Sequence, residues 1–401
     1  MRFANRTTRL GGQAADAWVV HDLAVERLRR GDDIILLSIG DPDFDTPAPI
    51  VAAAVQALSA GRTHYAPVDG EPALREAIVA RAGAALGFAV PSDQVVVFPG
   101  AQAALFALAQ CLFEDGDEVI VPEPAYVTYE GLLGAAGAVM RQVPLRPERR
   151  FRIDASDVAG AITPRTRGLL LNFPHNPTGA LLGAEEAAGI AGLCHRHDLM
   201  LISDEVYAAL TFGDGPPRSP ASLPGMRERT AVVSSLSKSH AMTGWRCGWT
   251  ITSEALAEHL RAVARCMYFG MAPFVQDAAI VALRDAGPET ARLRDEYRNR
   301  ARLVTERLAV VPGMECRLPE AGMYVFADVP KMGMSGTRFA RELLEAAGVA
   351  VTPGEGFGPS GAGHVRITLG VDEARLVDAC ERIAAFARGR YPVVDPVTAR
   401  T

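Results

Sequence analysis

The stretch QVVVFPGAQAALFALAQCLFEDGDEVIV (94–121) decides the fold, because it joins a short apolar run, a turn, a helical pattern and a second apolar run. Further short apolar runs are RGLLLN (167–172), LMLIS (199–203), AVVSS (231–235) and GWTIT (248–252). Between two of them, AEEAAGIAGLCHRH has the periodicity of a helix. Nearly continuous apolar strands that alternate with helices predict an α/β fold whose mostly parallel sheet is covered on both faces.

The pattern changes after about residue 285. A charged helical segment at 289–310 is followed by MYVFADV (323–329), a helical pattern at 337–348, HVRITLG (364–370) and an amphipathic segment at 373–389. These segments predict a smaller α+β domain, which the chain before about residue 46 joins. We therefore expect a large domain at 47–285 and a small domain built from 1–46 and 286–401.

Composition excludes several classes of protein. The 401 residues are 49% hydrophobic and 22% charged, which is typical of a globular chain. No stretch approaches the roughly 18 uninterrupted apolar residues of a membrane helix, and the first residues lack the apolar core of a secretory signal. A net charge of −6 argues against nucleic acid as the main partner. We expect a cytoplasmic protein without membrane or nucleic-acid partners.

Cysteine and histidine spacing gives no metal site. The six cysteines form no C-x-x-C pair, and their spacing offers neither a zinc site nor a dense disulfide framework. His195 and His197 in CHRHD could bind a metal together, but a solvated helix end is the favoured interpretation. No metal is inferred.

Lysine is the informative residue type. It occurs only at Lys238 and Lys331, so 39 of the 41 basic residues are arginine. A coding bias toward arginine explains this composition, yet a lysine that persists can carry chemistry that arginine cannot. A lysine amine forms an imine, whereas a guanidinium stays protonated and is a poor nucleophile. Lys331 in VPKMGM is predicted to lie in a loop, so Lys238 is the candidate for chemistry.

Lys238 lies in SSLSKSHAMTGWRCGW (234–249), directly after a predicted strand. A lysine at such a strand end can form a Schiff base with an aldehyde cofactor. Arg246 can neutralise a phosphate, and Ser235 and Ser237 can donate hydrogen bonds to it. The alternative is a solvated loop that happens to contain one lysine.

Two further strands end in polar residues. Asp204 ends LMLIS, and a carboxylate there can keep a pyridinium nitrogen protonated, with Tyr207 reaching a ring hydroxyl from the same side. A helix N-cap is the simpler role for Asp204. Asn172 and the following PHNPTG (174–179) can aim the amide of Asn176 at a ring oxygen, although turn formation explains the prolines and the glycine equally well.

An anion site and a carboxylate site complete the set. At Gly100, Ala101 and Gln102 a strand joins a helix, so free backbone N–H groups can receive a phosphate. This segment lacks the G-x-x-x-x-G-K-S/T pattern of a nucleotide-binding loop. Arg366 in HVRITLG can hold a substrate carboxylate with two parallel hydrogen bonds, or form a structural ion pair. Together these residues match what pyridoxal phosphate and an amino acid require.

Six segments in order along the chain resemble the class I/II aminotransferases of pyridoxal-phosphate fold type I. They are GDPDFDTP (40–47), HYAPVDGEPALREAI (64–78), NFPHNPTG (172–179), SDEVY (203–207), SLSKSHAMTGWRCGW (235–249) and HVRITLG (364–370). The resemblance spans nearly the whole chain and implies a mostly parallel seven-stranded sheet between helices, beside a smaller α+β domain.

The resemblance also implies a role for each candidate residue. Lys238 would bear the Schiff base and move the proton between the substrate Cα and the cofactor, and Asp204 would pair with the pyridine nitrogen. Asn176 and Tyr207 would bond the phenolic oxygen, and Tyr126 would stack on the ring. The phosphate contacts would come from Ala101, Gln102, Ser235, Ser237, Arg246 and Tyr65 of a second subunit. Arg366 would bind the α-carboxylate, with Gly40 and Asn172 close by, and Asn172 would also belong to the cofactor-binding set. A homodimer with shared sites follows from the role of Tyr65.

Within the family, the sequence is most similar to bacterial arginine–pyruvate transaminases, which favours arginine or a related guanidino amino acid as donor and a 2-oxo acid such as pyruvate as acceptor. A guanidino group needs a carboxylate or aromatic partner in the pocket, and the candidate carboxylates are Asp16, Asp22, Asp69 and Glu123. The alternatives are an aspartate or aromatic aminotransferase, and elimination, decarboxylation or oxidation on the same cofactor. A DNA-binding regulator with this fold would need a fused helix-turn-helix, for which the segment before residue 40 leaves little room.

Overall fold

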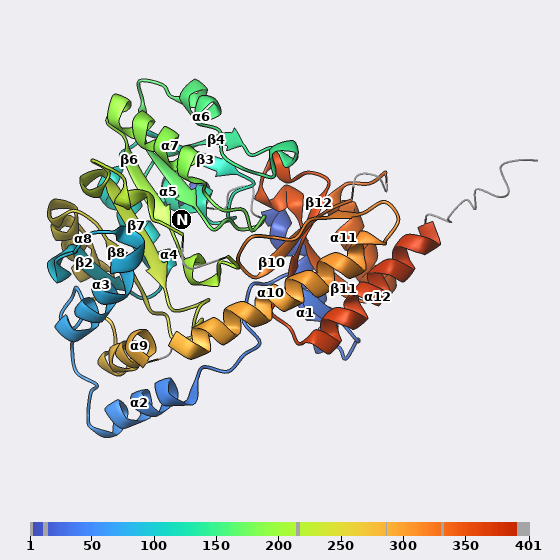
Figure 1. Cartoon of the computed structure of the whole chain (residues 1–401), viewed down its shortest axis with the longest axis horizontal. Coiled ribbons are helices and arrows are strands. Elements are labelled where there is room, and N and C mark those ends of the chain that lie inside the picture. Colours follow the sequence, from blue (N-terminus) through green and yellow to red (C-terminus); the bar gives the residue numbers. More distant parts are fainter. Residues whose placement is uncertain (1–2, 11–14, 214–216, 286, 330–332, 391–401) are drawn as a thin grey trace, which may run out of the picture.

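A computed structural model describes residues 3–10, 15–213, 217–285, 287–329 and 333–390, and its strands form two sheets (Figure 1). The larger sheet has seven strands in the order β2-β8-β7-β6-β5-β3-β4. Its strands are β2 (Val95–Phe98), β3 (Glu118–Glu123), β4 (Val139–Pro144), β5 (Thr166–Asn172), β6 (Met200–Asp204), β7 (Thr230–Ser235) and β8 (Gly248–Ile251). Only β8 runs antiparallel to its neighbours, so the mostly parallel seven-stranded sheet is confirmed.

Helices cover both faces of this sheet because its buried strands are apolar on both sides (Figure 1). Leu170 and Ile202 pack with one set of helices, whereas Leu169 and Leu201, one residue earlier in each strand, pack on the opposite face, as the period of two along a strand requires. The first face carries α4 (Ala101–Leu112), α5 (Tyr129–Ala135) and α8 (Glu254–Met267). The second face carries α2 (Ala48–Ser59), α3 (Pro72–Leu86), α6 (Ala155–Ala161), α7 (Ala184–His197) and α9 (Pro273–Asp285).

The smaller sheet combines the two ends of the described chain. Its order is β1-β11-β12-β10-β9, with β1 parallel to β11 and the other pairs antiparallel. Its strands are β1 (Ile35–Leu37), β9 (Glu315–Cys316), β10 (Tyr324–Asp328), β11 (Val349–Pro353) and β12 (His364–Thr368). The accompanying helices are α1 (Ala15–Arg29), α10 (Gly287–Ala309), α11 (Gly336–Ala347) and α12 (Glu373–Arg390). This arrangement confirms the smaller α+β part.

Short 3₁₀ helices lie in the connections. They are η1 (Asn5–Arg9), η2 (Ser92–Gln94), η3 (Pro147–Arg149), η4 (Ala208–Leu210), η5 (Pro220–Ser222), η6 (Arg227–Arg229), η8 (Gly354–Phe357) and η9 (Pro359–Gly361). None of the described helices combines the length and the apolar character needed to cross a membrane.

Arg300 on α10 fastens that helix to two other segments. Its Nη1 donates to Asp43 Oδ1 at 2.7 Å and to the carbonyl oxygen of Leu369 at 2.9 Å, and its guanidinium lies 4.6 Å from the ring centroid of Phe44. The Arg300 side chain is buried, so the interaction is poorly screened by solvent. It therefore holds together α10, the loop after β1 and the end of β12.

We expect Arg300→Met to lower the free energy of unfolding by about 3 kcal/mol, because the Asp43 carboxylate and the Leu369 carbonyl lose their shared donor. The matched control is Arg338→Met, which removes an exposed ion pair with Glu342 and should cost less than about 1 kcal/mol. Urea unfolding of both variants beside the wild type measures the difference. Equal losses would contradict a fastening role for Arg300.

Candidate active site

Three adjacent strands of the larger sheet bring polar residues to one edge. β5 ends at Asn172, β6 at Asp204 and β7 at Ser235. Asn172 lies beside Asp204 in the register of β5 and β6, and Asp204 lies beside Val233 of β7. The carboxyl ends of parallel strands are where α/β proteins bind ligands. The candidate site therefore begins at this edge.

Two adjoining cavities lie at this edge. The first has a volume of about 190 Å³, and eleven of the twelve residues predicted to bind the cofactor line it. These eleven are Ala101, Gln102, Tyr126, Asn172, Asn176, Asp204, Tyr207, Ser235, Ser237, Lys238 and Arg246. The second, of about 310 Å³, shares Lys238 with the first and adds Gly40 and Arg366. The structure thus brings together residues that are up to about 330 positions apart in sequence.

Lys238 lies where the two cavities meet. It follows β7 in the loop that leads to β8, and its Nζ donates a hydrogen bond to the carbonyl oxygen of Gly40. Within the described part of the chain, no carboxylate lies within ion-pair distance of Nζ. The amine therefore faces the cavities without a neutralising acid.

Asp204 is a buried carboxylate that is only 4% exposed. Its Oδ2 accepts a hydrogen bond from the Tyr129 hydroxyl at 2.7 Å, and its Oδ1 accepts one from the Val206 backbone N–H at 3.3 Å. Burial raises the pKa of Asp204 to about 6, and these two hydrogen bonds oppose the rise. None of the described basic side chains pairs with it, so this position can stabilise a cationic group of a ligand.

Tyrosines form a wall of the site. Tyr126 lines both cavities, and its ring meets the Tyr129 ring edge to face at a centroid distance of 5.5 Å. The hydroxyls of Tyr207 and Tyr324 lie 3.1 Å apart. Burial is the main cause that raises the pKa of Tyr207 well above its ordinary value, and the nearby Tyr324 adds to it. The Tyr207 hydroxyl is therefore a neutral hydrogen-bonding group.

Asn172 and Asn176 are joined by a hydrogen bond. The Asn176 backbone N–H donates to Asn172 Oδ1 at 3.0 Å, and Asn172 Nδ2 donates to the carbonyl oxygen of Asp204 at 3.1 Å. Both ends of the Asn172 amide thus bond to the backbone. Asn176 Oδ1 in turn accepts from Arg366 Nη1 at 3.1 Å. Asn172 positions the neighbouring residues, whereas Asn176 presents its side chain to the ligand space.

Arg246 lies against the start of α4. Its Nη1 donates to the carbonyl oxygen of Thr243 at 2.7 Å. Gly100 precedes α4 with a φ of 90°, and a Cβ built there would clash with Arg246 Nη2. Glycine is therefore required for this close approach, which puts a guanidinium beside the free N–H groups of Ala101 and Gln102. Since no described acid pairs with Arg246, the arrangement fits an anionic group such as a phosphate.

Arg366 on β12 is 5% exposed and also lacks an acidic partner among the described residues. Besides Asn176, its guanidinium donates to the Ser38 carbonyl oxygen at 2.8 Å, and it stacks 4.3 Å from the ring centroid of Tyr324. Its Nε is buried without a hydrogen-bond partner. A buried, unneutralised guanidinium with an orphaned donor fits a ligand carboxylate.

Several predictions fall outside the cavities. Tyr65 is 85% exposed and lines neither of them; its ring meets that of Phe269 at a centroid distance of 5.0 Å. Of the carboxylates suggested for a guanidino side chain, Asp22, Asp69 and Glu123 do not line either cavity. The side chain of Asp16 and all of Lys331 lie outside the described residues.

Sequence reasoning missed some residues that line the cavities. Tyr129, Thr243 and Tyr324 are examples, and so are Asp41 and Trp18 at the 310 Å³ cavity. Asp41 belongs to the GDPDFDTP segment, so its position after Gly40 was an available signal. The sequence around Trp18 and Tyr324 gave no indication of a ligand site, because their positions depend on how α1 and β10 pack in the folded chain.

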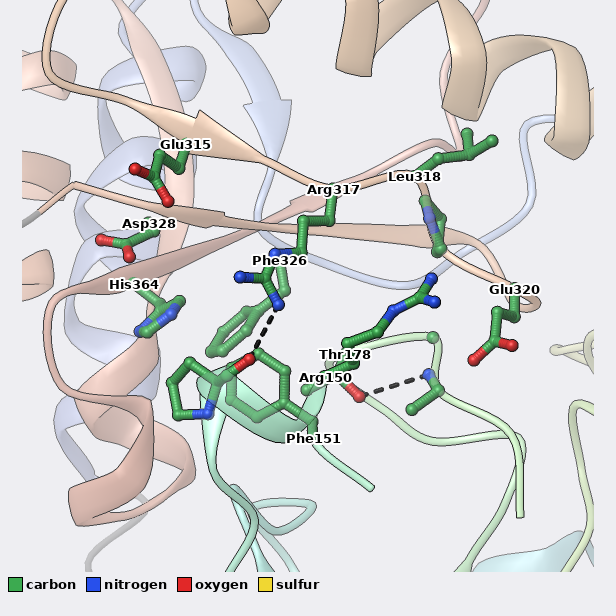
Figure 2. Close-up of a pocket in the computed structure, with 14 residues that line it drawn as sticks. Arg150, Phe151, Thr178, Glu315, Arg317, Leu318, Glu320, Phe326, Asp328 and His364 are labelled. Atoms are coloured by element: carbon green, nitrogen blue, oxygen red, sulfur yellow. Dashed lines mark hydrogen bonds between the residues drawn. The ribbon is translucent and has the colours of Figure 1, made fainter. Parts of the chain in front are cut away.

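Another cavity lies away from this site (Figure 2). Its volume is only about 60 Å³, and it lies between the segment around Arg150 and strands β9 and β10. Arg317 reaches across it and donates to the carbonyl oxygen of Pro147 at 2.7 Å. Neither Lys238 nor Arg366 lines it. It is too small for a cofactor and is not the candidate site.

The fold and the site define an α/β enzyme in which a lysine amine, a buried carboxylate and two guanidinium groups line adjoining cavities. The family model for class I and II aminotransferases matches residues 32–383. The chain therefore belongs to the class I and II aminotransferase family, and it is an aminotransferase.

Known relatives extend over nearly the whole chain. The arginine–pyruvate transaminase of Pseudomonas aeruginosa is 52% identical, covering 96% of this chain and 98% of that protein. The aspartate aminotransferase of Pyrococcus horikoshii is 36% identical, covering 91% and 93%. The solved aspartate aminotransferase of Thermus thermophilus with maleate superposes with a TM-score of 0.90 at 35% identity, covering 96% of this chain and 100% of that one.

We expect Asp204→Asn to stabilise the ligand-free protein at pH 8 by about 1–3 kcal/mol, because the charged carboxylate no longer has to be buried. The folded-state pKa of Asp204 lies near 6, above the ordinary value of 3.8. The wild-type protein therefore regains this stability as the pH falls through 6, and the difference between the two proteins disappears by about pH 4. Urea unfolding of both proteins from pH 8 to pH 4 tests this, and a difference that does not change with pH would contradict it.

Proposed function

We propose that this aminotransferase moves the amino group of L-arginine, or of a related guanidino amino acid, to a 2-oxo acid such as pyruvate, with pyridoxal 5′-phosphate bound at Lys238. The observation that carries the proposal is the position of the Lys238 amine between the buried Asp204 carboxylate and the buried Arg366 guanidinium. Identity of 52% to an arginine–pyruvate transaminase, against 36% to an aspartate aminotransferase, supports arginine as the donor.

The described residues fit pyridoxal phosphate group by group. The unpaired Asp204 carboxylate suits a protonated pyridine nitrogen, and the Tyr126 ring offers a stacking face. Arg246 with the N-terminus of α4 suits the phosphate, helped by the hydroxyls of Ser235 and Ser237, which line the same cavity. The Tyr207 hydroxyl and the Asn176 amide suit the phenolic oxygen. The pyridine nitrogen and the phosphate would thus each meet an opposite charge that has no ion-pair partner among the described residues, and the phenolic oxygen would meet neutral hydrogen-bonding groups.

The bound cofactor supplies an electron-accepting ring conjugated to its aldehyde carbon. Lys238 would bind that carbon covalently at rest and, once displaced by the substrate amine, would move the substrate Cα proton through Nζ. The Gly40 carbonyl oxygen accepts a hydrogen bond from Nζ, which places the amine where the two cavities meet. Arg366 would orient the α-carboxylate through two parallel hydrogen bonds from its guanidinium group. The hydrogen bond from Arg366 to Asn176 would fix the orientation of that guanidinium plane.

Other reactions share this machinery. An aspartate or aromatic aminotransferase is the closest alternative, because relatives with those names are 34–38% identical to this chain. Elimination, decarboxylation or oxidation would use the same Cα proton chemistry. Only transamination converts an added 2-oxo acid into its amino acid in stoichiometric amount, so product analysis with pyruvate separates these reactions.

We also propose the division into a large domain at 47–285 and a small domain from 1–46 and 286–401. The two sheets support it, because β1 and β9–β12 all come from the latter segments.

We further propose that the protein forms a homodimer. The exposed ring of Tyr65, which meets the exposed ring of Phe269, supports a surface that a second subunit covers. A cytoplasmic location remains a prediction from the sequence.

We expect Lys238→Ala to abolish the cofactor absorbance band near the visible edge and to lower turnover about 10³-fold or more, because both the covalent link and the proton-moving amine are lost. Lys331→Ala, which removes the other lysine, is the matched control and should retain the band. Absorbance spectra and single-turnover assays of both purified variants give the result. Turnover near the wild-type rate in Lys238→Ala would refute the assignment.

The shared site is tested with mixed dimers. Tyr65→Ala should bind the cofactor phosphate weakly, and Lys238→Ala should be inactive. When the two chains are co-expressed, each hybrid dimer has one site with both defects and one site with neither, so about a quarter of the wild-type sites should return. The control is the hybrid of a doubly substituted chain with a wild-type chain, in which neither site is intact. It must be separated from the wild-type homodimers of the same mixture by a different tag on each chain, because those homodimers alone would supply about a quarter of the wild-type sites. Absence of restored activity would contradict a contribution of Tyr65 across an interface.

A further inference from the structure

Asp41 is an acidic side chain at the 310 Å³ cavity that contains Lys238 and Arg366. It directly follows Gly40, whose carbonyl oxygen holds Lys238 Nζ. Its Oδ1 accepts a hydrogen bond from the Thr243 hydroxyl at 2.7 Å, which fixes the carboxylate at the cavity wall. Across the described chain, no basic side chain forms an ion pair with Asp41. Its negative charge therefore remains available to a ligand.

Trp18 on α1 lines the same cavity and is 36% exposed. Its ring meets the His21 ring edge to face, at 74° and a centroid distance of 5.8 Å. His21 Nδ1 lies 2.9 Å from the Ser38 hydroxyl, and the Ser38 carbonyl oxygen accepts a hydrogen bond from Arg366. Contacts therefore run from Arg366 through Ser38 and His21 to Trp18, and they position the indole relative to the carboxylate-binding guanidinium.

The charges of this cavity select among side chains. Lys238 and Arg366 are the only basic groups among the described residues that line it. Both are already assigned, Lys238 to the cofactor and Arg366 to the α-carboxylate. A donor with an acidic side chain would therefore find no free cation among the described residues that line the cavity. Its side chain would instead lie near the Asp41 carboxylate, which would repel it. A cationic side chain would find a carboxylate and an aromatic face instead.

We infer that Asp41 and Trp18 form the subsite that selects a cationic donor side chain, with the Asp41 carboxylate facing a guanidinium and the Trp18 ring packed against it. This inference rests on the proposed function and names the residues that carry its specificity. Carboxylates bind guanidinium groups through charge-assisted hydrogen bonds, and indole faces attract cations.

Binding of matched ligands to the holoenzyme tests the subsite without turnover. 5-Guanidinopentanoate has the carboxylate and guanidinium of arginine but no amine that could react. 5-Ureidopentanoate has nearly the same shape and no charge. We expect the wild-type protein to bind the guanidino compound more tightly in calorimetry, and Asp41→Asn to reduce that preference about tenfold.

Two sets of variants isolate the effect. Asp45→Asn changes an exposed aspartate of the same segment that lines neither cavity, and it should keep the preference. Trp18→Ala should weaken binding of the guanidino compound about fivefold, and Trp18→Phe should recover most of the loss because a ring face returns. The ratio of kcat/KM for arginine to that for citrulline should fall in parallel in Asp41→Asn.

The outcomes separate the subsite from the proposed function. If the wild-type enzyme prefers cationic donors, and if Asp41→Asn reduces this preference while Asp45→Asn keeps it, both the subsite and the arginine donor are supported. If the preference is unchanged in both Asp41→Asn and Trp18→Ala, the proposed subsite is wrong, but the assignment of arginine as the donor is not affected. A wild-type enzyme that transaminates neutral or acidic donors with no preference for arginine over citrulline overturns the arginine donor, and the subsite with it.

Discussion

A chain of three hydrogen bonds connects the two sheets and fixes the relative positions of the residues at the site. Arg366 of the small sheet donates to the Asn176 amide, the Asn176 backbone donates to Asn172, and the Asn172 amide donates to the Asp204 carbonyl oxygen. The guanidinium at one end and the carboxylate at the other are thereby kept in fixed relation. Because each bond is buried, loss of one would leave an unsatisfied polar group, which strongly favours a single geometry.

The site keeps charges that the protein does not neutralise. Asp204, Arg246 and Arg366 have no ion-pair partner among the described residues, although two of them are almost completely buried. Such an arrangement lowers the stability of the ligand-free fold and is retained where ligands supply the missing charges. Binding of a ligand with complementary charges should then stabilise the protein as well as prepare it for chemistry.

Most of the larger sheet could be predicted from the sequence, because strands such as LLL at 169–171 are buried on both faces and read as apolar runs. Strand β4 was missed because it lies at the sheet edge and four of its six residues are exposed. Most of the eleven predicted residues that line the 190 Å³ cavity could be named from the sequence because they lie in recognisable motifs or where a strand joins a helix, whereas Tyr126 came from the family resemblance alone. Asp41 could have been assigned to the ligand space from its place directly after Gly40. Trp18 could not, because only the packing of α1 against the other segments brings it to the cavity.

The scarcity of lysine has a practical chemical consequence. Lys238 is the only lysine among the described residues, and Lys331 is the one other lysine of the sequence. Reagents that acylate amines would therefore find few lysine targets on a surface whose positive charge is almost entirely guanidinium. Labelling of Lys238, measured separately from that of Lys331 and of the N-terminal amine, would report directly on whether the Lys238 amine is free.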